Sequence, residues 1–330
     1  MTDKGLDEPS MGKASRTKVE STRREKIAAQ RAAQRRAEQR KRILIASGSV
    51  VVVLAVVLAF VVIKLNNKPA AAAATPSASA SPQGKTNGPT GAALAAVVTK
   101  VTSVPASTLN AVGTGNGAVT SKPSTISGST LTENGKPEML YFGAEYCPYC
   151  AAERWAMIVA LSRFGTFKGL ATVHSALSNG AGDAEPDPDT PSFTFLNATY
   201  TSKYLTFTPV ELETNIPDPS NGEYTSLQTP TAAEQALSTK YAGPDGSIPW
   251  IDFGNHYMIS GVSYDPAVLD GLGNGGWSTI ATDLSNPSSP VAQAVDGTAN
   301  YITAAICKGM TNNQPASACT PAVQALESQI

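Results

Sequence analysis

Two cysteines separated by two residues are the part of this chain best suited to chemistry. The motif Cys147-Pro148-Tyr149-Cys150 follows a strand-like segment, Glu138–Gly143, and precedes a helix-like segment, Ala151–Phe164. Two intervening residues bring the thiols close enough for a disulfide with little backbone movement. A cysteine at a helix N-terminus has its thiolate stabilised by unpaired N–H groups and by the helix dipole. Pro148 would cost no hydrogen bond in the first helical turn.

The two thiols are expected to have different roles, because the thiolate is the nucleophile in disulfide exchange. We expect Cys147 to be the exposed attacking thiol. Cys150, one turn into the helix, would be the resolving thiol that releases the mixed disulfide. Glu145 and Glu153 would raise the pKa of the thiols if close, and Arg154 would lower it. The sequence leaves that balance open.

A lone CxxC motif also suits half a zinc site, a copper-transfer loop or a structural disulfide. Zinc would need two more ligands, and Cys307 and Cys319 enclose eleven residues rather than the short spacing of a ligand pair. The chain has two His residues, which also disfavours copper. We therefore predict no metal. No nucleotide, haem or flavin motif is recognisable, so we predict no cofactor.

The elements around the motif follow an α/β order. Strand patterns are found at 170–177 and within 192–212, helical composition at 229–241, 290–310 and 320–330, and a hairpin pattern at 249–261 that turns at Gly254-Asn255. Strands that alternate with helices in this way predict a sheet of mixed direction.

From about residue 136 to residue 330 the chain resembles the thioredoxin superfamily. The block Glu145–Trp155, EYCPYCAAERW, resembles the hallmark of a domain-of-unknown-function family of membrane-anchored thioredoxin-like proteins, and that resemblance extends back toward residue 92. It implies a thioredoxin-like mixed sheet with a large insertion, about residues 178–247, and a redox role. It implies no particular substrate.

The resemblance also gives a role to Ile248-Pro249. Thioredoxin-like folds place a cis-proline at the start of the strand that faces the CxxC motif, where the backbone stays free to pair with a substrate strand. An ordinary trans-proline at a strand start is the alternative. With the resemblance, Pro148, Tyr149, Ile248 and Pro249 are the expected substrate-binding residues. Trp250 and Tyr257 would line the same groove or pack in the core.

Two positions depart from the thioredoxin pattern. Tyr141 stands six residues before Cys147, where thioredoxins usually carry a buried Asp that relays protons. Tyr146 stands where a Trp usually precedes the first cysteine. The insertion also places about 98 residues between Cys150 and Pro249. These departures leave open whether the protein would oxidise, reduce or isomerise disulfides.

Residues 43–63 form a run of 21 uncharged, mostly aliphatic residues. A helix of that length spans ~31 Å, enough for a bilayer core of ~30 Å. Lys and Arg number nine in residues 23–42 and two in 64–83. This bias predicts a single-pass cell-membrane protein with a cytoplasmic N-terminus and an extracytoplasmic C-terminal part. A cleavable signal peptide fits less well, because 42 residues precede the run.

The segments around this run differ in composition. Residues 1–42 hold 13 Lys/Arg against 6 Asp/Glu and form a basic tail suited to anionic lipid headgroups. Residues 64–135 are a linker rich in Ala, Ser, Thr, Pro and Gly, with a possible short helix at 92–104. Residues 136–330 form the expected domain. A charged fraction of 15% argues against a nucleic-acid binder.

Cys307 and Cys319 flank a polar turn between two helical segments. Outside the cytosol we expect them to form a structural disulfide. A second redox pair that relays electrons to Cys147 and Cys150, or two free thiols, are the alternatives.

Together these patterns predict an extracytoplasmic, membrane-anchored thiol–disulfide oxidoreductase acting on the thiols and disulfides of exported proteins. A protein or small-thiol redox partner would supply or accept the electrons. The alternative is a non-catalytic thioredoxin-like binding or assembly module in which CPYC is a structural disulfide. Structural disulfides typically have reduction potentials below about −300 mV, so that measurement separates the two.

Overall fold

The computed structural model describes residues 88–177, 187–243, 246–270 and 276–330. The predicted basic tail and the predicted transmembrane run at 43–63 lie outside these residues. Within them, no single helix is long and apolar enough to cross a bilayer. Two consecutive helices, α2 (Gly91–Thr102) and α3 (Ala106–Val112), meet that test only when taken together, with a bend of 60° at their junction.

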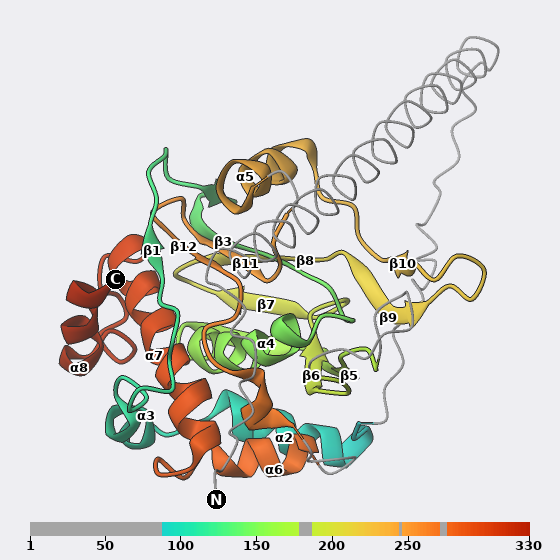
Figure 1. The fold of residues 1–330 in the computed structure, drawn as a ribbon. Coiled ribbons are helices and arrows are strands. Elements are labelled where there is room, and N and C mark those ends of the chain that lie inside the picture. The colour runs from blue at the N-terminus through green and yellow to red at the C-terminus, as the bar shows by residue number, and fades with distance from the viewer. Residues whose placement is uncertain (1–87, 178–186, 244–245, 271–275) are drawn as a thin grey trace, which may run out of the picture. The chain divides into compact units, whose positions relative to one another are not determined.

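A six-stranded mixed sheet forms the centre of the described residues (Figure 1). One path through it runs in the order β1 (Ser124–Thr125), β12 (Tyr257–Ser260), β11 (Trp250–Phe253), β3 (Lys136–Gly143) and β2 (Thr132–Glu133). The sixth strand, β8 (Thr206–Glu211), pairs with β3 in parallel, whereas β11 pairs with β3 in antiparallel orientation. The predicted α/β class with a sheet of mixed direction is therefore confirmed.

Strand β3 is buried on both faces, which explains its nearly continuous apolar sequence. Successive side chains of a strand point to opposite faces. Met139 and Tyr141 accordingly pack in the large core that contains α4 (Pro148–Leu161) and α7 (Pro290–Gly309). Leu140 and Phe142 pack with Trp250 and with Leu237 of α5 (Ala232–Ala242). Figure 1 shows α5 on one side of the sheet and α4 and α7 on the other.

The segment between β3 and β11 is rich in strands. Three small antiparallel pairs lie outside the central sheet: β4 (Gly165–Lys168) with β7 (Thr199–Ser202), β5 (Ala171–His174) with β6 (Pro191–Thr194), and β9 (Glu213–Pro217) with β10 (Tyr224–Ser226). Helix α5 begins after Thr231, whose side chain forms a capping box with Glu234. The strand patterns at 170–177 and 192–212 and the helix at 229–241 are thus present.

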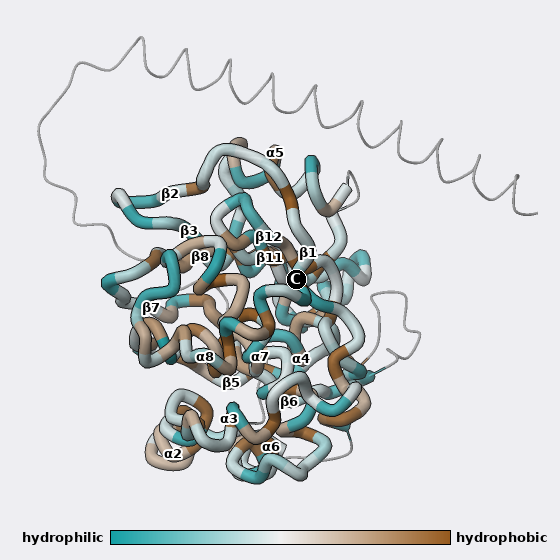
Figure 2. The backbone as a smooth tube through the Cα atoms, turned by 90° about the vertical axis from the view of Figure 1, so that its left-hand side faces the viewer, coloured by the Kyte–Doolittle hydropathy of each residue, from teal (hydrophilic) through white to brown (hydrophobic). Residues whose placement is uncertain are grey.

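The C-terminal part contains α6 (Gly276–Asp283), α7, α8 (Pro321–Gln324) and two 3-10 helices, Pro266–Leu269 and Ala325–Gln329. The predicted disulfide between Cys307 and Cys319 is present and joins α7 to the segment before α8. In Figures 1 and 2, helices α2, α3 and α6 lie at the end of this unit opposite α5. The predicted hairpin is also present, with positive φ angles at Gly254 and Asn255.

Some sequence predictions of local structure were wrong or incomplete. A turn was expected after the helix at 92–104, but α3 occupies residues 106–112. Helix α6 was missed because it is only eight residues long, although Trp277, Ile280 and Ala281 are spaced for one helical face. Helix α4 begins at Pro148 rather than Ala151 and is not buried on one face only. Every residue of α4 except Tyr149 is buried.

Candidate functional site

The CPYC motif connects β3 to α4, and Cys147 is the N-cap residue of α4. Its backbone is extended, and its Sγ atom accepts a hydrogen bond from the backbone N–H of Cys150 at 3.2 Å. Pro148 occupies the first helical turn, where its missing N–H costs nothing. The predicted strand–CxxC–helix arrangement is therefore present, and both thiols are free.

Cys147 is less exposed than expected. Its side chain is 4% exposed, while Cys150 is 0% exposed, so neither thiol projects openly into solvent. The reason is packing, because Tyr146 and Ile248 lie against the two cysteines. The Cys147 thiol also donates a long hydrogen bond, 4.0 Å, to the carbonyl oxygen of Ile248. Only a small part of the Cys147 side chain is thus accessible to solvent.

The Ile248–Pro249 peptide bond is cis. It lies beside the motif, since the Ile248 carbonyl contacts Cys147, and it directly precedes β11. Trp250 and Tyr257 are buried, at 0% and 7% exposure, and pack in the core rather than lining a groove. Of the predicted substrate-binding residues, Tyr149 is the one with a well-exposed side chain, 39%.

A fully buried ion pair lies beneath the motif. Arg154 is four residues after Cys150 on α4, and hence on the same side of the helix. Its Nε and Nη2 atoms donate to the two carboxylate oxygens of Glu211 at 3.0 and 2.6 Å. Nη2 also donates to the carbonyl of Ala144, just before the motif, at 2.8 Å. Glu211 in turn accepts the backbone N–H of Phe195 at 3.0 Å. A positive charge is thereby held at a fixed place near both thiols.

The local electrostatics give the two thiols different acidities. Burial raises the pKa of Cys147, but hydrogen bonds from Cys150 and the charge of Arg154 outweigh it, so the pKa lies below its ordinary value. For Cys150, burial and the adjacent Cys147 thiolate raise the pKa well above its ordinary value, and Arg154 opposes them only in part. Cys147 is therefore the thiol that ionises first. Among the charged residues considered from the sequence, Arg154 is the one that lowers the pKa of Cys147.

Glu153 of α4 and Tyr141 of β3 are fully buried titratable groups. Glu153 is buried and accepts hydrogen bonds from the N–H and hydroxyl of Ser263, both at 2.9 Å. Burial raises its pKa to about 7. Burial also raises the pKa of Tyr141 well above its ordinary value, so the phenol keeps its proton at neutral pH. Its hydroxyl lies so close to Gly143 that any larger residue there would collide with it.

Glu211 is the member of this site that sequence reasoning missed. It is separated from Arg154 by 57 positions, and no motif connects them. Parallel pairing of β8 with β3 brings it in, because Glu211 is opposite Gly143 at the end of β3 that leads into the motif. The available signal was an acidic residue at the end of a predicted strand, and Glu213, two positions later, shares that feature.

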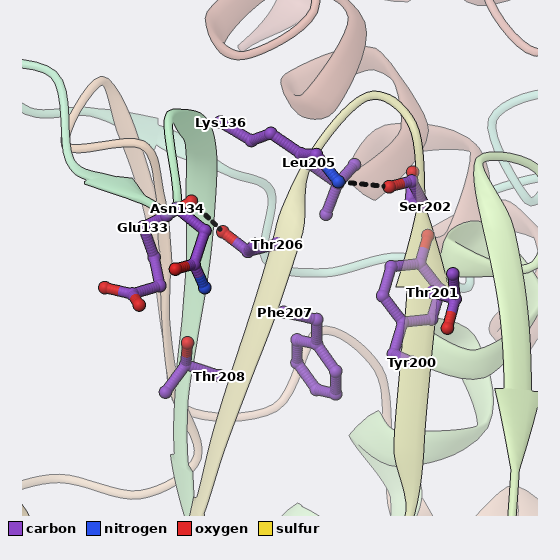
Figure 3. A pocket seen from close by; sticks show the side chains of 10 residues that line it. All are labelled: Glu133, Asn134, Lys136, Tyr200, Thr201, Ser202, Leu205, Thr206, Phe207 and Thr208. Atoms are coloured by element: carbon purple, nitrogen blue, oxygen red, sulfur yellow. Dashed lines mark hydrogen bonds between the residues drawn. The ribbon is translucent and has the colours of Figure 1, made fainter.

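A separate pocket of about 260 Å³ lies at the other end of β3 (Figure 3). Its lining residues are Glu133, Asn134, Lys136, Tyr200, Thr201, Ser202, Leu205, Thr206, Phe207 and Thr208. Lys136 reaches across and donates to the carbonyl of Ser202 at 2.7 Å. The pocket starts where β3 and β8 begin, whereas the thiols follow the end of β3. It is therefore not part of the thiol site.

Within the part of the chain that the structure describes, no group of three or more His, Cys, Asp or Glu side chains is placed to hold a metal ion.

Comparison with known proteins gives one family. No curated protein and no solved structure matches the chain. A family model described as "Domain of unknown function (DUF929)" matches residues 122–241. That range contains β3, the CPYC motif, Arg154 and Glu211, and it ends before Ile248. The expected resemblance to a domain-of-unknown-function family is thus supported over the residues that build the thiol site.

Proposed function

We propose that this chain is a thioredoxin-like thiol–disulfide oxidoreductase. The observation that carries the proposal is Cys147 at the N-cap of α4, where it accepts the Cys150 N–H and has a lowered pKa. The strand order β8-β3-β11-β12 is compatible with a thioredoxin-like sheet. So is the position of the CxxC motif, which follows β3 and starts helix α4. The cis bond at Ile248–Pro249 agrees with the same assignment.

In the reductive direction, the Cys147 thiolate attacks one sulfur of a substrate disulfide. A mixed disulfide forms, the substrate S–S bond breaks, and the first substrate sulfur leaves as a thiolate that takes up a proton. Cys150 then loses its proton and attacks Cys147, which releases the second substrate thiol. The pair loses two electrons and becomes a disulfide. The oxidative direction is the reverse, and a protein or small thiol would reset the pair.

The two acidities suit these two steps. A lowered pKa makes Cys147 a thiolate at the start, whereas Cys150 stays protonated until the mixed disulfide has removed the charge on Cys147. Once that charge is gone, the remaining positive field of Arg154 favours ionisation of Cys150. The ion pair with Glu211 keeps Arg154 in place through both steps.

We further propose that the domain acts outside the cytoplasm, on exported proteins, and is held at the membrane by residues 43–63. The support is the apolar run of 21 residues and the excess of Lys and Arg before it. The topology is checked with a membrane-impermeant thiol reagent on intact cells, which should label Cys147. Labelling only after the cells are broken would contradict it.

The function is tested on the full-length chain in a neutral detergent. Replacing Cys147 with Ser should lower the rate of disulfide exchange to background, at least about a hundredfold, and Cys150→Ser should trap mixed disulfides. The Cys147/Cys150 midpoint in graded glutathione buffers should lie above about −300 mV. Full activity of the Cys147→Ser protein would refute the proposal. A midpoint below that value would favour the binding-module alternative.

A further inference from the structure

Two exposed apolar side chains lie near the CPYC motif. Among the described residues, Tyr149 and Leu177 are the large apolar side chains that are well exposed, at 39% and 65%. Tyr149 belongs to the CPYC motif. Leu177 follows Ala176, whose N–H donates to the carbonyl of Tyr146 at 2.9 Å. Both exposed residues therefore lie close to the motif, although exposing such groups in solution is unfavourable.

An aromatic ring of the β9–β10 hairpin also lies beside the motif. Tyr224 of β10 stacks on Tyr146, with 4.2 Å between ring centroids and 4° between ring planes. The backbone N–H of Glu145 donates to the carbonyl of Glu213 at 2.8 Å, which fixes β9 beside the start of the motif. The hairpin is thus attached to the thiol site by a stacked ring pair and a backbone hydrogen bond.

The β9–β10 hairpin also carries acidic residues beside the motif. Residues 213–226 contain Glu213, Asp218 and Glu223 but no Lys or Arg. Asp218 and Glu223 are exposed. Burial, and then the neighbouring charge of Glu223, raise the pKa of Glu213. Glu213 also acts electrostatically on Tyr146, which places its carboxylate near the stacked rings.

We propose that Tyr149, Leu177 and the Tyr146–Tyr224 stack, with the acidic hairpin beside them, form a docking surface for a cationic polypeptide segment. The occupant is a stretch of a substrate protein in which a cysteine is flanked by apolar residues and by Lys or Arg. Charge complementarity selects this occupant, since residues 213–226 carry three acidic side chains and no Lys or Arg. The inference rests on the proposed function, because the docked segment is the one whose disulfide meets Cys147.

Docking on this surface leaves the exchange chemistry unchanged and raises the rate of encounter. Apolar contacts would hold the segment, and the carboxylates would select its charge. Steering by opposite charges speeds association by about 10- to 1,000-fold and weakens as salt screens the charges. The signature is therefore a rate that depends on substrate charge and on ionic strength.

The test uses the full-length chain in a neutral detergent and two short peptides. Both contain Leu-Cys-Tyr with the cysteine disulfide-bonded to mercaptoethanol; one has Lys on each side and the other has Glu. At low salt the Lys peptide should react about tenfold faster, and about 0.5 M salt should remove most of the difference. Equal rates for the two peptides would overturn the inference.

Variants assign the effect to the hairpin. In the double variant Glu213→Gln/Glu223→Gln, the ratio of the Lys-peptide rate to the Glu-peptide rate should fall from about ten to about two. The matched control Glu133→Gln/Asp283→Asn removes the same net charge away from the motif and should keep the ratio. Tyr224→Ala should slow both peptides, while Tyr224→Phe, which keeps the ring stack, should restore both. A ratio that falls equally in the control would assign selection to net charge and refute the hairpin's role.

A small neutral disulfide, hydroxyethyl disulfide, separates this inference from the proposed function. If the unmodified protein reduces it but does not distinguish the two peptides, the docking surface is refuted and the oxidoreductase stands. If the protein does not react with it at all, the oxidoreductase is refuted, and the docking inference is refuted with it.

Discussion

Helices α4 and α7 pack against each other and are buried along most of their lengths, yet the cysteines they carry lie in opposite settings. Cys147 caps the N-terminus of α4, where unpaired N–H groups and the helix dipole favour a thiolate. Cys307 lies in the last turn of α7, where the dipole disfavours one, and it is bonded to Cys319. The place of a cysteine on its helix therefore matters as much as the presence of a second cysteine.

The buried charges of the two helices differ in the same way. On α4, Arg154 donates two hydrogen bonds to Glu211, and the charge of that carboxylate helps to hold the pKa of Arg154 well above its ordinary value. On α7, Asp296 is fully buried, and neither of its carboxylate oxygens has a hydrogen-bond partner within the described residues. Burial raises the pKa of Asp296 to about 8. The charge near the thiols is therefore permanent, whereas the acid on α7 is protonated at neutral pH.

The largest expected effect comes from breaking the ion pair on α4. Glu211→Gln leaves the Arg154 charge buried without its partner and should lower the free energy of unfolding by about 3–5 kcal/mol. Chemical denaturation of residues 88–330 measures this loss. The exposed Glu133→Gln serves as control and should stay within about 0.5 kcal/mol. A loss below about 1 kcal/mol for Glu211→Gln would show that the pair contributes little.

The disulfide on α7 should affect stability without affecting exchange. Replacing Cys307 and Cys319 together by Ala reopens a loop with a sequence separation of 12 and should cost about 3 kcal/mol. Exchange through Cys147 should keep its rate, measured well below the variant's denaturation midpoint. If the exchange rate fell strongly in a folded variant, the second pair would be a redox relay rather than a structural link.

Replacing both partners on α4 separates charge from packing. Arg154→Met/Glu211→Met removes the ion pair without leaving an unpaired charge and should cost roughly 2 kcal/mol, since Ala144 and Phe195 lose hydrogen-bond partners. The pKa of Cys147 should rise, because the cation that favours its thiolate is gone. Iodoacetamide alkylation of Cys147 near pH 6 should therefore slow. An unchanged alkylation profile would show that the helix N-terminus suffices.

Per pH unit, the smallest expected effect is a pH dependence that originates on α7. The pKa of Asp296 is about 8 in the folded chain and about 3.9 when unfolded, so the folded state binds more protons between these values. Stability should fall as pH rises through this window, by about 1.4 kcal/mol per pH unit. Asp296→Asn should remove that slope and be the more stable protein at pH 7. Parallel stability curves for the two proteins from pH 5 to pH 7 would contradict the assignment.

The sequence by itself determined the local features of the site. The apolar run of Glu138–Gly143, the CPYC spacing and Pro148 sufficed to predict a strand, a thiol pair and a helix N-terminus. The Gly254-Asn255 turn and the helix cap at Thr231 also depend only on residues a few positions away. The disulfide between Cys307 and Cys319 was predicted correctly because the chain has only four cysteines, and the other two form the CPYC motif. Such features depend on backbone preferences and short spacings, which a sequence displays directly.

Tertiary structure alone decided what surrounds the thiols. Parallel pairing of β8 with β3 places Glu211 against Arg154, and packing of Tyr146 and Ile248 covers Cys147, which the sequence predicted to be exposed. Neither follows from local pattern, because the contacts join positions 57 and 101 residues apart. The pKa of a buried group depends on the charges and solvent that the fold places around it. The direction of the pKa shift of Cys147 therefore follows from the tertiary structure and not from the sequence pattern.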